Sequence, residues 1–161
     1  MKRSIGRGVV WMMAGCLLVA QAGCGGRMPE DLGVENGRLR PCPESPNCVS
    51  SFATDEQHGI ASLAIEGSPA AAWDALESEL MALERVEIVA SQGDYLHAVF
   101  TTRLMRYRDD VEFLMRPQQG EIAVRSASRV GHGDMGANRA RVESIRAALG
   151  ERGVVRMPIG D

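Results

Sequence analysis

Charged side chains recur at alternate positions in the middle of the chain, within segments that have the two-residue period of β-strands. The polar positions that would share one face of a sheet include His97, Arg103, Asp110, Glu112, Arg125 and Arg129. Guanidinium groups bind carboxylates and phosphates through two parallel hydrogen bonds, and neighbouring carboxylates can orient them. This pattern predicts either a groove for a small anionic ligand, lined by Arg103, Arg125 and Arg129, or a solvated face of cross-strand ion pairs.

Catalysis is a second hypothesis for the same residues. His97 or His132 would act as general base, oriented by Asp109, Asp110 or Glu112, with Ser126 or Ser128 as nucleophile. The chain has no G-x-S-x-G, H-E-x-x-H, phosphate-loop or dinucleotide-binding signature. We therefore assign no catalytic residue and expect neither a metal nor a cofactor, and a purely structural spacer is a third hypothesis.

The positions between the charged ones are apolar, as the buried face of a sheet requires. The expected strands are 58–67, 86–90, 95–104, 110–116 and 121–129. Ser68 and Pro69 suit the start of a helix that carries Trp73, Leu76 and Leu80 at helical spacing. A second helix is expected from about Asp134. The order β-α-β-β-β-β-α predicts an α+β fold, a small antiparallel sheet with two helices packed on one face.

Asn138 lies on the apolar stripe of the second expected helix, with Val142, Ile145 and Leu149. A buried amide needs hydrogen-bond partners. Asn138 is therefore expected either to hold the preceding loop or to contact a ligand. With its neighbour Arg139 it completes the set of candidate ligand-binding residues.

The first residues have the pattern of a secretory signal. Lys2, Arg3 and Arg7 precede an apolar run at 9–20. About 12 helical residues reach roughly 18 Å, less than the hydrocarbon core of about 30 Å. We expect residues 1–23 to be a cleaved signal peptide, and an uncleaved signal anchor is the alternative.

The segment 18–24 (LVAQAGC) resembles the lipobox of bacterial lipoproteins, although Gln21 stands where an apolar residue is usual. The resemblance implies that Cys24 is acylated and holds the protein to a membrane. Cys16 is a competing position, but cleavage there would leave 17–20 exposed on the exported product. Gly25 implies sorting to the outer membrane, facing the periplasm, if the source is Gram-negative. Residues 24–40 are then the lipidated cysteine and a flexible tether.

Cys42 and Cys48 lie in a proline-rich turn, where an oxidising compartment would allow a disulfide. Metal ligation is weaker, because the spacing is not that of a zinc site and no histidine lies in this turn. In a cytosolic protein both would be free thiols.

The charge balance argues against nucleic acid as a partner. The 161 residues carry 18 basic and 21 acidic side chains, a formal charge of −3. Cleavage before Cys24 removes Lys2, Arg3 and Arg7, so 15 basic residues remain against 21 acidic ones and the charge becomes −6. An acidic domain repels phosphate backbones. Lys2 is the only lysine, so the mature chain has no group for Schiff-base chemistry.

Several motifs, in this order, resemble family 1499 of the domains of unknown function. They are 42–51 (CPESPNCVSS), 95–98 (YLHA), 109–113 (DDVEF), 125–131 (RSASRVG) and 134–139 (DMGANR), followed by Arg141 and Glu143. The resemblance implies a single domain at 41–150, followed by a tail at 151–161, and a place in the cell envelope. It implies no activity. The leading hypothesis is a non-catalytic module that binds an envelope protein or a small anionic ligand.

Overall fold

The computed structural model describes residues 27–157, so the predicted signal peptide and Cys24 lie outside the described residues. The elements in chain order are β1 (Val34–Glu35), β2 (Arg38–Leu39), β3 (Cys48–Ser50), β4 (Leu63–Ala64), α1 (Pro69–Ala82), β5 (Val86–Gln92), β6 (Tyr95–Thr101), β7 (Arg108–Arg116), the short 3₁₀ turn η1 (Pro117–Gln119), β8 (Glu121–Ser128) and α2 (Ala137–Glu151). None of the helices in this range is long and apolar enough to cross a membrane.

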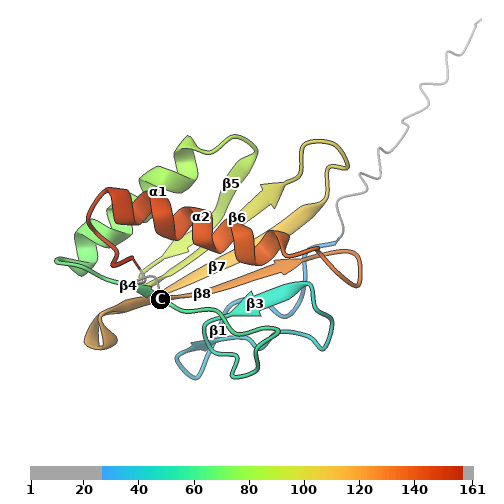
Figure 1. Ribbon diagram of the computed structural model, residues 1–161, viewed down its shortest axis with the longest axis horizontal. Helices are drawn as coiled ribbons and strands as arrows, with labels where there is room; N and C mark the ends of the chain where they lie inside the picture. Colours follow the sequence, from blue (N-terminus) through green and yellow to red (C-terminus); the bar gives the residue numbers. More distant parts are fainter. Residues whose placement is uncertain (1–26, 158–161) are drawn as a thin grey trace, which may run out of the picture.

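An antiparallel sheet with the strand order β3-β8-β7-β6-β5 forms the centre of the fold (Figure 1). From β5 to β8, each strand pairs with the next one along the chain. β3 pairs with one end of β8, and β4 pairs with the other. The predicted α+β fold is confirmed, and from β4 onwards the element order is the predicted one.

Both helices cover the same face of the sheet, and their apolar sides form the main core with it. Leu76 and Leu80 of α1 and Val142 of α2 pack with Phe113 of β7 in this core, and all four are fully buried. α1 begins as predicted, because the Ser68 side chain accepts a hydrogen bond from a backbone N–H of the first turn. Burial of these apolar stripes fixes the helices on the sheet.

The expected strand 58–67 is reduced to the two residues of β4, and Gly59 and Ile65 form only isolated bridges with Ser50 and Val155. Ile60 and Leu63 are buried, as the apolar pattern suggested. The carbonyls of Ala61 and Ser62, however, accept hydrogen bonds from the buried Arg146 of α2, at 2.6 and 2.7 Å. A side chain thus satisfies backbone groups that a neighbouring strand would otherwise bond.

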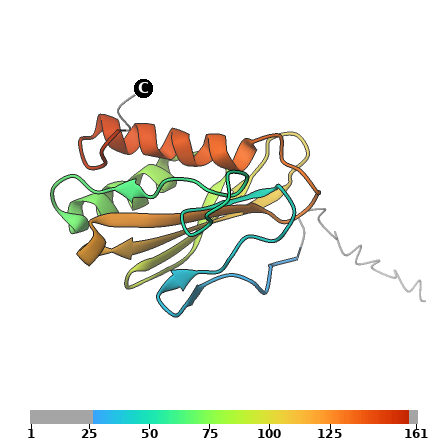
Figure 2. The ribbon, with the colours of Figure 1, turned by 60° about the horizontal axis from the view of Figure 1, so that its bottom comes forward.

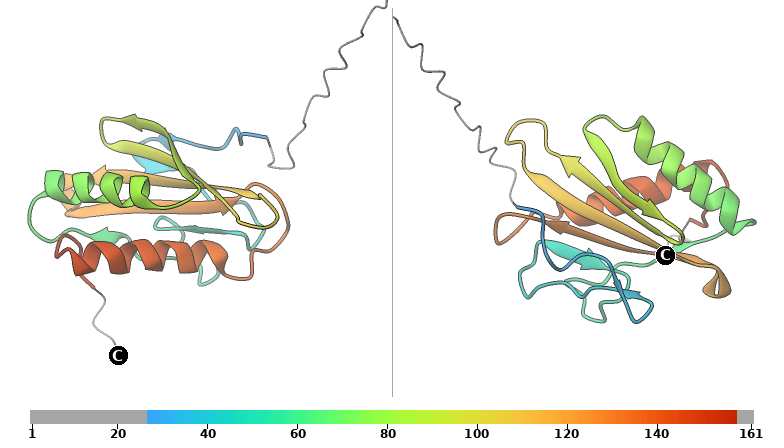
Figure 3. Two further views of the ribbon diagram at one scale, coloured as in Figure 1. Left: turned by 90° about the horizontal axis from the view of Figure 1, so that it is seen from above. Right: turned by 180° about the vertical axis from the view of Figure 1, so that it is seen from behind.

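The opposite face of the sheet is covered by residues 27–40, called here the N-terminal segment (Figure 2, Figure 3). Its strands β1 and β2 form a small hairpin. Leu39 of this hairpin is buried with Leu114 and Ala123 in a second, smaller apolar cluster. The expectation of a flexible tether is therefore wrong for residues 27–40, because Leu39 is anchored by apolar contacts.

Candidate functional site

The polar face of the sheet, defined here as His97, Asp110, Glu112, Arg125 and Arg129, is assembled as the alternation predicts. Glu112 of β7 is paired across the sheet with His97 of β6 on one side and with Arg125 of β8 on the other. These side chains are not solvated, because the N-terminal segment covers them and all but Arg129 belong to buried residues. Buried charges require partners, so the pairing within the face determines which of its groups can still bind a ligand.

Asp110 is the centre of one group of partners. Its Oδ1 accepts a hydrogen bond from His97 Nε2 at 2.7 Å. Arg129 donates to both carboxylate oxygens, each at 2.8 Å. Burial alone would raise the pKa of Asp110, but the hydrogen bonds from His97 and Arg129 outweigh it and hold this pKa below its usual value. The hydrogen bond to Asp110 in turn raises the pKa of Arg129.

Glu112 is the centre of a second group. Its Oε1 accepts hydrogen bonds from the Gly33 backbone N–H at 2.6 Å and from the Tyr95 hydroxyl at 2.8 Å. Its Oε2 accepts one from Arg125 Nη1 at 2.9 Å. Burial and the adjacent negative charge of Glu112 raise the pKa of Tyr95, which keeps this hydroxyl protonated as a donor.

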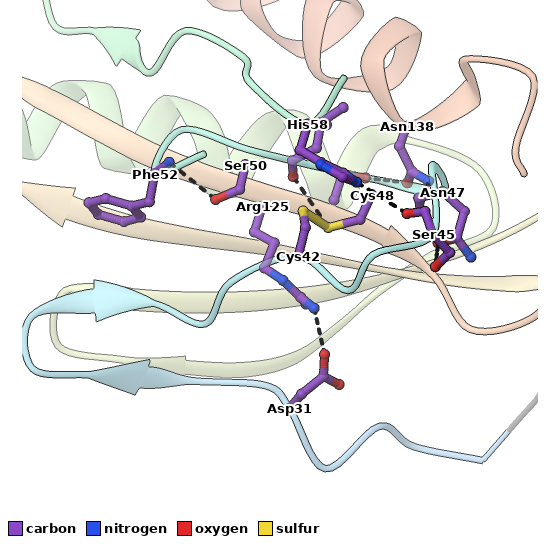
Figure 4. Close-up of a disulfide and its surroundings, with 12 residues drawn as sticks. Asp31, Cys42, Ser45, Asn47, Cys48, Ser50, Phe52, His58, Arg125 and Asn138 are labelled. Carbon is purple, nitrogen blue, oxygen red and sulfur yellow. Dashed lines mark hydrogen bonds and ion pairs between the residues drawn. A yellow bond between two sulfur atoms is a disulfide. The ribbon is translucent and has the colours of Figure 1, made fainter. Parts of the chain in front are cut away.

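Arg125 joins the polar face to the N-terminal segment (Figure 4). Its Nη2 donates to Asp31 Oδ2 at 2.7 Å. Its Nε is buried and has no hydrogen-bond partner among the described residues. Both Arg125 and Arg129 line a cavity of about 330 Å³, together with Pro29, Asp31, Pro43, Ser45, Asn47, Asp110, Ala127, Ser128 and Gly131. The cavity therefore has two guanidinium groups and two carboxylates in its wall.

Three of the predicted ligand-binding residues lie elsewhere. Arg103 is exposed in the loop after β6, because the strand ends at Thr101 and the alternation stops there. Asn138 and Arg139 belong to α2, which packs on the other face of the sheet. Arg139 donates to the backbone carbonyl of Gly59 at 2.7 Å and holds the loop before β4. Arg103 is therefore not part of a groove with Arg125 and Arg129, and Asn138 and Arg139 lie on the helix-covered side of the sheet.

Asn138 is fully buried and links several parts of the chain. Its side-chain nitrogen lies within hydrogen-bonding distance of the Asn47 carbonyl at 2.8 Å, Ser128 Oγ at 3.0 Å and Asp134 Oδ2 at 2.8 Å. Its carbonyl oxygen accepts a hydrogen bond from Ser126 Oγ at 2.6 Å. Of the two expected roles, these contacts match the one in which Asn138 holds the preceding loop.

The same contacts place both candidate nucleophiles on the helix-covered side. Ser126 and Ser128 bond to Asn138, whereas His97 projects from the other face of the sheet. His132 is exposed in the loop after β8. Among residues 27–157, no three His, Cys, Asp or Glu side chains are placed to hold a metal ion. The arrangement supports charge pairing and anion binding, and it does not bring a serine to His97.

A sequence model described as "protein of unknown function (DUF1499)" matches residues 38–149. The chain belongs to this family. No curated protein and no solved structure matches it. The DUF1499 match includes the whole polar face, whereas Asp31 and Gly33 of the N-terminal segment lie outside it.

The disulfide predicted for this DUF1499 domain is confirmed. Cys42 and Cys48 are bonded, with an S–S distance of 2.03 Å and a Cα–Cα distance of 5.7 Å. Between them, Pro43, Ser45 and Asn47 line the cavity beside Arg125. The disulfide thus closes the loop that forms one wall of the candidate site.

Sequence reasoning missed two side-chain partners in this site, Tyr95 and Asp31, and the backbone N–H of Gly33. Tyr95 alternates with His97 along β6, so its place on the polar face was readable, but its hydrogen bond to Glu112 depends on the cross-strand register. Nothing in the sequence indicated that Asp31 belongs to the site, because it lies in a segment with neither helical nor strand periodicity of its apolar residues.

Proposed function

We propose that this chain is a lipid-anchored protein of the cell envelope whose DUF1499 domain binds a small anionic ligand, a carboxylate or phosphate, in the cavity next to Arg125. The observation that carries the proposal is the pair between Arg125 Nη2 and Asp31 Oδ2. The Asp31 side chain is 52% exposed, whereas that of Arg125 is almost completely buried. The Asp31 carboxylate extends from the N-terminal segment into the site and occupies the position at Arg125 that a ligand carboxylate or phosphate would take.

The charges in the cavity wall favour an exchange of Asp31 for a ligand. Asp110 is fully occupied by His97 and Arg129, and Glu112 neutralises one side of Arg125. Asp31 is the remaining partner of Arg125. A ligand carboxylate or phosphate that replaces Asp31 preserves the ion pair and can also accept from Arg125 Nε. The cavity of about 330 Å³ suits a small molecule.

The envelope location is supported by the disulfide and by the signal pattern. Disulfides persist in oxidising compartments such as the bacterial periplasm. The lipobox resemblance at 18–24 supplies the anchor, and Gly25 favours the outer membrane. Mass spectrometry of the protein from its native membrane tests the anchor. Acyl chains on an N-terminal Cys24 are expected, and a chain that retains Met1 without acyl groups contradicts it.

Calorimetric titration with succinate and with inorganic phosphate tests the ligand class. Asp31→Ala is expected to strengthen binding, because the competing carboxylate is removed. Glu30→Ala removes the same charge from the adjacent, exposed position and leaves the Arg125 pair intact, so it is the matched control. The double variant Arg125→Ala, Arg129→Ala is expected to lose binding. Equal affinities in the Asp31→Ala and Glu30→Ala proteins contradict competition by Asp31 for Arg125.

A further inference from the structure

Two loops at one end of the sheet expose apolar side chains to solvent. The loop between β6 and β7 presents Leu104, which is 86% exposed, and Met105, which is 60% exposed. The loop between β8 and α2 presents a fully exposed Met135 and a partly exposed Val130. With Tyr107 these residues line a groove of about 750 Å³ and are called here the apolar end patch. Contiguous exposed apolar side chains of this kind mark an interaction surface.

The two loops hold their conformations by hydrogen bonds. Thr102 N–H donates to the Tyr107 carbonyl at 2.8 Å, and Tyr107 N–H donates to Thr102 Oγ1 at 2.9 Å. Asp134 accepts from the backbone N–H groups of Gly136 and Asn138, at 3.0 and 2.8 Å. Met135 has a φ of 53°, in the left-handed region that a side chain rarely adopts. The conformations that expose these apolar side chains are therefore fixed by hydrogen bonds within both loops.

The described chain begins at the same end of the molecule. Met28 Sδ lies 3.5 Å from Arg129 Nη2, directly before Val130 of the apolar end patch. Figures 1 and 3 show the start of the N-terminal segment beside both loops. Cys24 and Arg27 are three positions apart in the sequence, a span of at most about 11 Å in any conformation. An acyl group on Cys24 would therefore place the membrane next to this patch.

The charges around the apolar end patch also suit a membrane. Arg27, Arg103 and Arg106 are exposed near it, and none of them forms an ion pair within residues 27–157. Asp109 and Asp134 also line the groove, but Asp109 is paired with Arg141, so the three arginines face one remaining carboxylate and the local charge is positive. The whole chain is acidic by contrast, with a charge of −6 after the proposed cleavage. Arginines beside exposed apolar side chains match the anionic headgroups and acyl chains of a lipid surface.

We propose that the apolar end patch docks into the lipid surface next to the anchor and fixes the orientation of the domain. The inference rests on the proposed acylation of Cys24. Leu104, Met105 and Met135 enter the interfacial layer, and the three arginines bind lipid headgroups. The β7–β8 turn then points away from the membrane, because β7 runs for nine residues, or about 30 Å, between the two ends of the sheet.

The test uses the mature acylated protein in vesicles of phosphatidylethanolamine and phosphatidylglycerol. Leu104→Cys and Met135→Cys variants carry a nitrobenzoxadiazole label on the introduced thiol. Gln118→Cys, exposed in the turn at the far end of β7, is the matched control. The quencher is a nitroxide at a shallow acyl position, because interfacial side chains reach about 5–10 Å into the headgroup boundary. The labels at 104 and 135 are expected to lose most of their fluorescence, and the label at 118 to keep it.

Each other outcome overturns the inference in a different way. Equal quenching at all three positions, with acylation of Cys24 confirmed by mass spectrometry, overturns the docking and leaves the anchor intact. Blue-shifted labels at 104 and 135 without nitroxide quenching indicate that a second copy or another protein covers the patch. A chain without acyl groups overturns the anchor and the docking together, while anion binding at Arg125 is tested independently.

Discussion

Arg129 donates two parallel hydrogen bonds to Asp110, from Nε to Oδ2 and from Nη2 to Oδ1, each 2.8 Å long. This fork geometry is the strongest form of an arginine–carboxylate pair. Both side chains are almost completely buried, so neither can replace its partner by water. Asp110 also accepts from His97, which makes it the common partner of one donor on β6 and one directly after β8.

Asp110→Asn is expected to lower the free energy of unfolding by about 3 kcal/mol at neutral pH, because it leaves a buried guanidinium without a counter-charge. The pKa of Asp110 in the folded protein lies below the ordinary value of 3.8. Its stabilising contribution is therefore complete above pH 3.8 and is lost as the pH falls through the lower, folded-state pKa. Urea unfolding across this acid range should show the difference between wild type and variant shrinking with falling pH.

Asp94→Asn is the control for this measurement. It makes the same chemical change at an exposed position in the turn between β5 and β6. A shift within about 0.5 kcal/mol is expected for such a surface site. A pH-independent difference between wild type and Asp110→Asn would contradict the role of the carboxylate charge.

The two carboxylates on Arg125 should contribute very unequally to stability. Glu112 is completely buried and has three donors, so Glu112→Ala is expected to cost about 3–5 kcal/mol. Asp31 is half-exposed, so Asp31→Ala is expected to cost less than about 1 kcal/mol. Urea unfolding of both variants gives the comparison. A loss of similar size in the two would mean that Asp31 is a structural clamp, and ligand exchange at Arg125 would be disfavoured.

The alternation of polar and apolar residues along the strands was sufficient to predict which side chains lie on the polar face and which lie in the core. His97, Asp110, Glu112 and Arg125 share one face because side-chain direction has a period of two within any unbroken strand. Arg103 was misplaced by the same rule. The strand that was expected to contain it ends at Thr101. The loop residues that follow Thr101 include no glycine or proline that would indicate the end of the strand.

The covering of the polar face was not readable from the sequence. The strands β1 and β2 contain two residues each, too few for any period to be detected. Their position depends on the buried Leu39, on the contacts of Arg38 with Phe52, and on the hydrogen bonds that Asp31 and Gly33 make to distant strands. The hydrogen bonds of Asp31 and Gly33 join residues 94 and 79 positions apart, and contacts over such a separation leave no local pattern.

Asn138→Ala is expected to lower the free energy of unfolding by about 3 kcal/mol or more. The substitution removes the buried hydrogen bonds that join the Asn138 amide to Ser126, Asn47, Ser128 and Asp134, and each such bond contributes about 1 kcal/mol. Thermal and urea unfolding measure the loss. Ser144→Ala, at an exposed position of the same helix, is the control and should change stability by less than about 0.5 kcal/mol. Similar stabilities of the two variants would contradict the linking role of Asn138.

The last prediction concerns the disulfide beside the cavity. Cys42→Ala removes the cross-link but keeps Cys48, whose buried side chain can remain in β3 as a thiol. The two cysteines are six positions apart in the sequence, and the loop-entropy relation gives a loss of about 2 kcal/mol for so short a ring. Urea unfolding with and without dithiothreitol should show the same loss for reduced wild type as for the variant. The variant itself should not respond to the reductant.

Because the ring holds Ser45 and Asn47 in the cavity wall, opening it should also weaken succinate and phosphate binding. Unchanged affinity in the Cys42→Ala protein would show that this loop keeps its place without the cross-link. The Asn47 side chain, which donates to the Gly131 carbonyl at 2.7 Å, would then be the contact that fixes the loop.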